Sequence, residues 1–155
     1  MKHAMFKTLC ILTLALFVMS ISGAAATTAN GGKVVEVTKL DQIDAALKKG
    51  PVFLRLGADW CSHCRAFGPT LKELAKKYSG KATFMTVDID RSPKLKAYFG
   101  VSRIPDCSVI VSKKNGKYVY MQQNGKTTTV RSNARIISDQ KKSVYEKVLN
   151  FAVKR

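Results

Sequence analysis

A nearly continuous apolar run, PVFLRLG at residues 51–57, constrains the fold of this chain more than any other segment. A strand that is apolar at successive positions is typical of one covered on both faces of a sheet. Further strands are predicted at 33–37, 81–90 and 107–112, and helical patterns separate them. Strands that alternate with helices predict an α/β fold with parallel pairing.

The helical patterns have recognisable ends. Thr38 and Asp41 form a T-x-x-D cap signal for a first helix, and a second, long helix is expected to end near Ser79. A short helix is predicted within 92–100, where Ser-Pro opens it and Gly closes it. A final helix is predicted to begin at Ser138, with an apolar stripe along one side.

Two turn signals follow the last apolar strand. KKNGK at 113–117 and Asn-Gly at 124–125 each predict a hairpin. Hairpins add antiparallel strands, so the sheet is predicted to be mixed, with helices on both faces and an extended hairpin region near the C-terminus.

The first 26 residues have the layout of a secretory signal. Lys2 and Lys7 precede an apolar run, and small residues at Ala24 and Ala26 follow it. We expect cleavage near Ala26, export to the periplasm or cell exterior, and one domain over 27–155. The alternative is an N-terminal membrane anchor, since the apolar run is near the lower limit of about 17 residues for a span. Cys10 lies in this run and is given no role in the domain.

The chain carries a formal net charge of +17, from 27 Lys and Arg against 10 Asp and Glu. Such a field attracts acidic surfaces, for example anionic lipid, wall polymers or acidic proteins. The charges are scattered and an exported protein seldom meets nucleic acid, so no nucleic-acid partner is predicted.

Two cysteines, Cys61 and Cys64, come directly after the buried strand, in ADWCSHC. A zinc site needs about four ligands, and three cysteines and His63 are all that 27–155 offers, so no metal is predicted. A c-type haem would need histidine at Arg65, so no cofactor is predicted. A structural disulfide across two residues would close a very small loop and remove little unfolded-state entropy.

A redox dithiol fits this position better. Unpaired backbone N–H groups and the helix dipole favour an anion at a helix start. Cys61 is therefore expected to be an exposed, easily ionised nucleophile. Cys64, one turn further on, would be more buried and would resolve a mixed disulfide formed by Cys61.

ADWCSHCRAFGP and YFGVSRIPD together resemble two signatures of the thioredoxin superfamily, and the resemblance covers roughly residues 33–120. It implies a thioredoxin-like fold, with Cys61 as the attacking thiol and Cys64 as the resolving thiol. Trp60 would be a wall of the site, or alternatively a packed aromatic. Pro105 would be the cis-proline that faces the dithiol, and Ile104 would pair with the substrate backbone.

Two residues depart from the usual pattern. His63 stands between the cysteines, and in its protonated form it would stabilise a thiolate. Arg55 stands six residues before Cys61, where the family usually buries an acid. Arg55 could hold a thiolate by its charge or could form a buried ion pair with Asp88. Cys107 is predicted to be a buried apolar residue and not a third redox thiol.

We therefore expect a monomeric, exported thiol–disulfide oxidoreductase that acts on proteins with cysteines or disulfides and exchanges electrons with a membrane or soluble redox partner. His63 and Arg55 favour an oxidant or isomerase. The alternatives are an extracytoplasmic reductase, serving cytochrome c maturation or thiol repair, and a thioredoxin scaffold that only binds its clients.

Overall fold

A computed structural model describes residues 32–138 and 140–155. The predicted signal segment 1–26 and Cys10 lie outside these residues. The elements follow in the order β1 (Val34–Glu36), α1 (Leu40–Leu47), β2 (Val52–Gly57), α2 (Ser62–Lys77), β3 (Thr83–Asp88), α3 (Pro93–Tyr98), β4 (Asp106–Lys114), β5 (Lys117–Met121), β6 (Thr127–Thr128), the 3-10 helix η1 (Arg131–Ala134), β7 (Ile136–Ile137) and α4 (Lys142–Val153).

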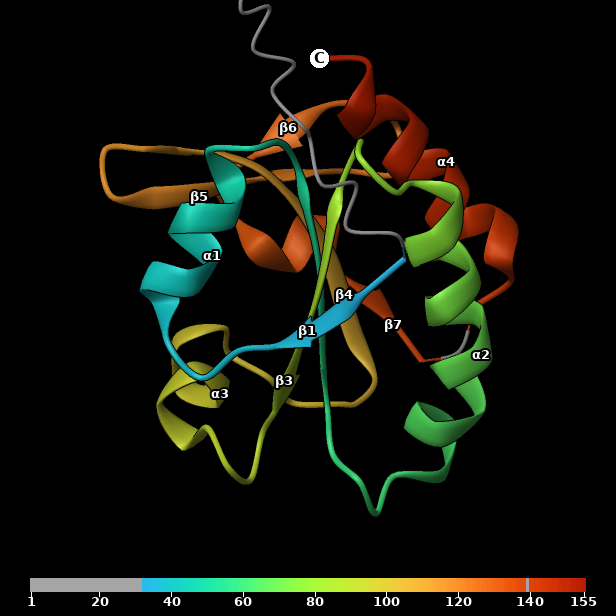
Figure 1. The fold of residues 1–155 in the computed structure, drawn as a ribbon. Coiled ribbons are helices and arrows are strands. Elements are labelled where there is room, and N and C mark those ends of the chain that lie inside the picture. The colour runs from blue at the N-terminus through green and yellow to red at the C-terminus, as the bar shows by residue number, and fades with distance from the viewer. Residues whose placement is uncertain (1–31, 139) are drawn as a thin grey trace, which may run out of the picture.

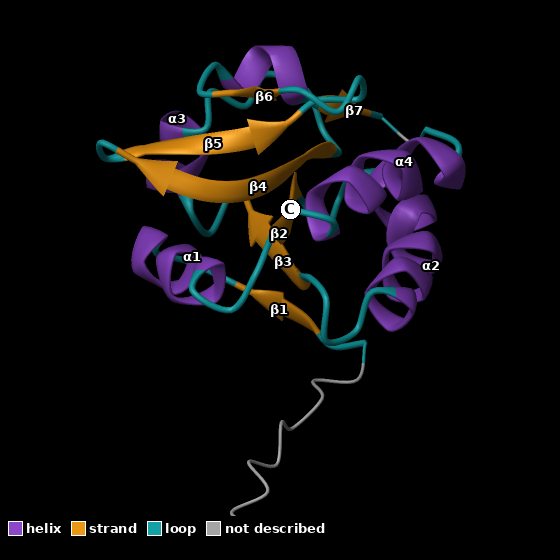
Figure 2. Cartoon of the chain, turned by 90° about the horizontal axis from the view of Figure 1, so that it is seen from above, coloured by secondary structure: helices purple, strands orange, loops and turns teal. Residues whose placement is uncertain are grey.

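The seven strands form one mixed sheet in the order β1-β3-β2-β4-β5-β6, and β7 pairs with β4. The strands β1, β3 and β2 run parallel, whereas β4 is antiparallel to β2. The helices α1 and α3 cover one face of the sheet, and α2 and α4 cover the other (Figure 2). The predicted α/β architecture with helices on both faces is thus confirmed.

The central strand β2 is covered on both sides, as its apolar run predicts. Leu54 and Leu56 pack in the core beneath α1 and α3. Phe53 points the other way, stacks on Phe84 at 5.1 Å between ring centroids, and meets the ring of Tyr145 from α4. Two cores on opposite faces cover β2, and its last residues lead to the loop before α2 at the lower edge of the molecule (Figure 1).

The predicted hairpins are present. Asn115 and Gly116 both have positive φ, 50° and 75°, which is the backbone of the tight turn that the Asn-Gly signal predicts. The turn joins β4 to β5, and a second turn at Asn124–Gly125 leads to the two-residue strand β6.

Two predicted helix starts are wrong. The N-cap of α1 is Lys39 and not Thr38. The side-chain oxygen of Gln42 accepts hydrogen bonds from the backbone N–H groups of Thr38 and Lys39. The last helix begins at Lys142 and not at Ser138. Ser138 has a φ of 65°, which is left-handed backbone that cannot start a helix, and its N–H donates to the Pro105 carbonyl at 2.9 Å.

Candidate active site

Cys61 is the N-cap residue of α2. Its extended backbone, with φ −76° and ψ 111°, places Sγ where the backbone N–H of Cys64 donates to it at 3.2 Å. A helix start leaves such N–H groups without partners inside the helix, and they stabilise negative charge. Cys61 is only 7% exposed, so it is more enclosed than the sequence led us to expect.

Cys64 lies one turn along α2 and is 1% exposed. Burial and the neighbouring Cys61 sulfur raise the pKa of the Cys64 thiol, while the charge of Arg55 acts in the opposite direction. Both cysteines are free thiols. One sulfur therefore lies at the helix start with a backbone donor, and the other lies deeper and favours its protonated form.

The loop between α3 and β4 approaches the outer sulfur. The Ile104–Pro105 peptide bond is cis, and the Ile104 carbonyl lies 3.9 Å from Cys61 Sγ. Pro105 is buried and Ile104 is half-buried. The Ile104 carbonyl, which the family resemblance assigns to substrate binding, therefore lies next to the outer cysteine, and the cis-proline follows it directly.

Trp60 is 67% exposed, which excludes the alternative of a packed core aromatic. Its indole Nε1–H donates to the Asp90 carboxylate at 2.7 Å. Asp90 follows β3, so the loops after two neighbouring strands meet beside Cys61. Asp90 could not be predicted from the sequence, because nothing in the local pattern links it to Trp60, thirty positions earlier.

His63 is exposed in the first turn of α2. Its side chain therefore lies on the outer surface of the helix that carries both sulfurs. Its influence on the thiolate stays a prediction.

Arg55 does not pair with Asp88. No hydrogen bond or ion pair joins the two among the described residues. Instead Asp88 accepts the N–H groups of Asp90 and Arg91, which lowers its pKa, and its other oxygen lies 3.6 Å from the Arg91 guanidinium. Asp88 thus fastens its own loop, and the ion-pair alternative from the sequence analysis is wrong.

Arg55 lies beside the deeper sulfur. A Cβ added to Gly57 would be 2.9 Å from Arg55 Nη2 and 3.0 Å from Cys64 Sγ, so both atoms border the same small space. Arg55 Nε is buried and has no hydrogen-bond partner. A cation therefore occupies the position beneath the dithiol where the family usually places an acid, and Gly57 is the residue that leaves room for it.

Cys107 is fully buried on β4, directly opposite Arg55 on β2. Burial strongly raises the pKa of its thiol, so it stays protonated and packs as an apolar side chain. Within the described residues no group of three or more His, Cys, Asp and Glu side chains is arranged to hold a metal ion. None of the helices described has both the length and the apolar character to cross a bilayer.

Sequence comparisons relate this chain to known proteins. A family model described as thioredoxin matches residues 33–136. Thioredoxin of Staphylococcus aureus is 36% identical over 72 residues, which is 46% of this chain and 68% of that protein.

Solved structures agree on the fold. Thioredoxin from Trypanosoma brucei brucei superposes with a TM-score of 0.62 at 16% identity, over 83% of this chain and 97% of its own. A mutant thioredoxin from Halobacterium salinarum gives a TM-score of 0.61 at 18% identity, over 81% of this chain and 96% of its own.

The family match and the fold agree with the geometry of the site. This chain combines three features: two cysteines at the start of α2, a neighbouring loop with a cis-proline, and a mixed sheet with helices on both faces. Relatives of this kind are redox proteins that act in general on disulfides of other proteins. The chain belongs to the thioredoxin family.

Proposed function

We propose that this protein is an exported thiol–disulfide oxidoreductase that oxidises or rearranges cysteines of other proteins. In the oxidising direction, a substrate thiolate attacks Cys61 of the Cys61–Cys64 disulfide and releases Cys64 as the leaving thiolate. A second substrate thiolate then attacks the substrate sulfur of the mixed disulfide and releases Cys61. Two electrons pass to the protein, and the substrate gains one disulfide.

One observation carries this proposal, namely the position of Cys61 Sγ. It accepts a backbone N–H at 3.2 Å and lies 3.9 Å from the Ile104 carbonyl. The donor stabilises Cys61 when it departs as a thiolate, and the backbone of the half-buried Ile104 offers a place for a substrate strand to pair. A sulfur that takes part in exchange needs both an anion-stabilising contact and a bound partner.

Arg55 supports the oxidising direction. Cys64 must leave as a thiolate when the protein disulfide opens, and a neighbouring cation stabilises that anion. Arg55 thereby favours opening of the protein disulfide. Wherever the reduced Cys64 is ionised, Arg55 also makes the disulfide a stronger oxidant, by about 30 mV for each 1.4 kcal/mol. A buried acid at this position would act in the opposite direction.

The midpoint potential of the Cys61–Cys64 couple tests the direction. The protein is equilibrated with glutathione buffers of known ratio, and the oxidised fraction is read by thiol alkylation and mass spectrometry. We expect a potential well above that of cytosolic thioredoxin, which is about −270 mV. A value at or below it would rule out the oxidant and leave the reductase of cytochrome c maturation or thiol repair.

Export is tested separately. A full-length chain expressed in a bacterial host is fractionated, and the mature N-terminus is sequenced. We expect cleavage near Ala26 and recovery outside the cytoplasm. A full-length chain held in the membrane fraction would instead favour the N-terminal anchor.

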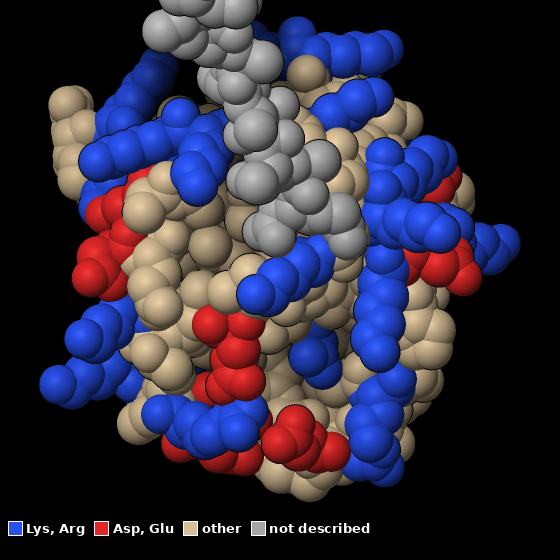
Figure 3. All heavy atoms as spheres, viewed as in Figure 1, with Lys and Arg blue, Asp and Glu red and all other residues tan. Residues whose placement is uncertain are grey.

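A second candidate function rests on the surface charge. Lys and Arg side chains form a column over α2 in Figure 3, where Arg65, Lys72, Lys76 and Lys77 are exposed. Such a column could dock a thioredoxin scaffold on an acidic surface without any redox step. The double variant Cys61→Ser/Cys64→Ser separates the two functions. The redox function predicts that this variant loses all biological activity, and the binding function predicts that it keeps full activity.

A further inference from the structure

A fully buried carboxylate follows Pro105 directly. Asp106 has 0% exposure and receives two parallel hydrogen bonds from the Arg131 guanidinium, at 2.8 and 3.0 Å. A third comes from Arg135 Nη2 at 2.7 Å. Both arginines belong to the segment 131–135, which contains η1 and precedes β7. Two cations from a late part of the chain therefore hold one carboxylate at the start of β4.

The same two arginines also hold the other side of the loop. Arg131 Nη1 donates to the Phe99 carbonyl at 2.8 Å, and Arg135 Nη2 approaches Ser102 Oγ at 3.4 Å. The loop from Phe99 to Asp106 carries Ile104, so its beginning, its middle and its end are all tied to one short segment. We call Asp106, Arg131 and Arg135 the loop clamp.

The loop clamp is costly as a device for stability. Buried ion pairs replaced by apolar side chains often leave a protein equally stable or more stable, because two charges must lose their water. Here the Nε atoms of both arginines are also buried without hydrogen-bond partners. Planar, bidentate contacts between guanidinium and carboxylate fix relative orientation, however. The arrangement is therefore better suited to setting a geometry than to holding the fold together.

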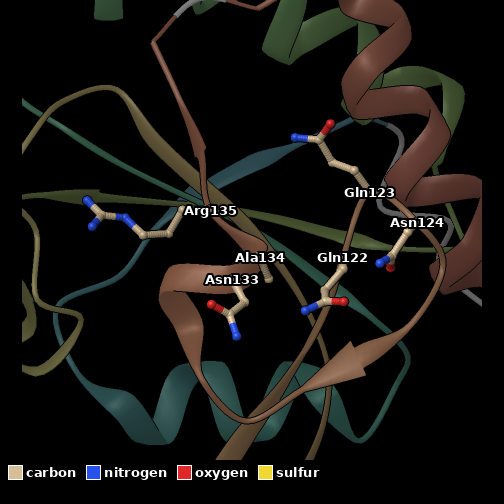
Figure 4. A pocket seen from close by; sticks show the side chains of 6 residues that line it. All are labelled: Gln122, Gln123, Asn124, Asn133, Ala134 and Arg135. Carbon is tan, nitrogen blue, oxygen red and sulfur yellow. The ribbon is translucent and has the colours of Figure 1, made fainter.

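The neighbouring cavity does not compete for these charges. A polar cavity of about 240 Å³ lies beside the clamp, lined by Gln122, Gln123, Asn124, Asn133, Ala134 and Arg135. Figure 4 shows the Arg135 guanidinium pointing away from the carboxamides of this cavity. The Arg135 guanidinium donates hydrogen bonds to Asp106 and Ser102, so its charge interacts with the loop and not with the cavity.

We propose that Arg131 and Arg135 are positioning residues that hold the Ile104 backbone at the distance from Cys61 at which an extended polypeptide can pair with it. The proposal rests on the proposed function and adds a substrate class: the clamp serves disulfides or thiols carried on a polypeptide backbone. A small disulfide has no backbone to pair with Ile104 and reacts at Cys61 without help from the clamp.

The test compares two substrates in the variants Arg131→Gln and Arg135→Gln. Each variant keeps one arginine on Asp106, so the carboxylate is not left unpaired. One substrate is the insulin disulfide, reduced by the dithiothreitol-fed protein, and the other is the neutral 2-hydroxyethyl disulfide. We expect kcat/KM for insulin to fall about tenfold and that for the small disulfide to change less than twofold.

Two further readouts separate positioning from general damage. The midpoint potential of the couple should change little, since the Cys64 N–H that donates to Cys61 Sγ and the Arg55 guanidinium beside Cys64 are both left in place. Backbone hydrogen exchange should become faster within 99–106 and remain unchanged in β2 and β3. Lys142→Gln, which removes one cation from an exposed pair with Glu73, is the matched control and should match the wild type in every assay.

An equal loss with both substrates, or no loss with either, would overturn the proposal. If Arg131→Gln does not fold, Arg131→Lys keeps the charge but loses the bidentate contact, and the same selective loss is expected at smaller amplitude. Failure of the proposed function has a different signature: a wild-type midpoint potential at or below that of cytosolic thioredoxin would rule out the oxidant. The selective loss with insulin in the variants does not depend on that value.

Discussion

Arg55 lies beside Cys64, and the absence of a side chain at Gly57 leaves the space for this contact. The guanidinium and the deeper sulfur both border the empty space above the Gly57 Cα, and Asp88 is bonded elsewhere, to its own loop. Of the two alternatives left open by the sequence, the ion pair with Asp88 is absent, and the Arg55 guanidinium lies beside the dithiol. Its redox consequences can be tested one residue at a time.

Gly57→Ala tests the shared space. The new methyl group would lie 2.9 Å from Arg55 Nη2 and 3.0 Å from Cys64 Sγ, so one of them must move. We expect a loss of about 1–3 kcal/mol in the free energy of unfolding, the usual cost of overpacking. Urea unfolding of the reduced protein measures it.

Gly68→Ala is the matched control for that variant. Gly68 lies inside α2, and an added Cβ would meet no atom within 4 Å. Alanine is favoured over glycine in a helix by about 0.8–1.0 kcal/mol, so this variant should be more stable than the wild type. A similar destabilisation in both variants would show that the crowding at Gly57 does not matter.

Arg55→Met tests the charge itself. Methionine retains much of the side-chain length but removes the cation, so the Cys64 thiolate loses its nearest positive charge. We expect the midpoint potential, measured at alkaline pH where the reduced Cys64 thiol is ionised, to become more negative by about 30 mV or more, equivalent to about 1.4 kcal/mol. Equilibration with glutathione measures the shift, and Lys142→Met provides the control for loss of a distant cation. A potential that is unchanged or more positive would contradict the role given to Arg55.

Alkylation should distinguish the three thiols of the domain. Burial and the Cys61 sulfur raise the pKa of Cys64, and Cys107 has 0% exposure. Under limiting iodoacetamide at neutral pH we expect Cys61 to react first, Cys64 much more slowly and Cys107 only after unfolding. Peptide mapping by mass spectrometry gives the order. Equal labelling of Cys61 and Cys64 would contradict the assignment of attacking and resolving thiols.

Stability should fall in alkaline solution. Because burial raises the folded-state pKa of Cys107 above the unfolded value, the folded protein keeps a proton that the unfolded chain releases. The contribution is complete below about pH 8.5, the ordinary thiol pKa, and is lost progressively as the pH rises above it.

Cys107→Ala isolates this effect. In urea unfolding between pH 7 and 10.5, its stability should decline less steeply than that of the wild type, by up to about 1.4 kcal/mol per pH unit. Tyr120, whose pKa burial raises to about 12, remains in both proteins and accounts for part of the common slope. Parallel curves for the two proteins would show that Cys107 does not stay protonated.

The central part of the fold could be predicted because its signals are local. The apolar run of β2, the position of Cys61 at a helix start and the Asn115–Gly116 turn each occupy a few neighbouring residues. Local patterns also predicted that Cys107 is buried. The surroundings of Arg55, in contrast, depend on the hydrogen bonds that Asp88 accepts from its own loop. The presence of opposite charges on two adjacent strands does not predict whether they form an ion pair.

The loop clamp could not be predicted from the sequence for a related reason. Asp106 and Arg131 are 25 residues apart, and the intervening chain has only the two-residue strand β6 after the β4–β5 hairpin. The segment Ile136–Ile137 is too short to show the periodicity of a strand, so β7 was not expected and the final helix was placed too early. The carboxylate and its two arginines meet through tertiary folding alone.

The exposed indole beside Cys61 has a practical consequence. Trp60 is the only tryptophan in the chain. Because Trp60 directly precedes Cys61 and its N–H donates to Asp90, its fluorescence emission should report on the surroundings of the dithiol without an attached dye. Opening and closing of the cysteine pair can thus be followed in real time by light emitted from the protein itself.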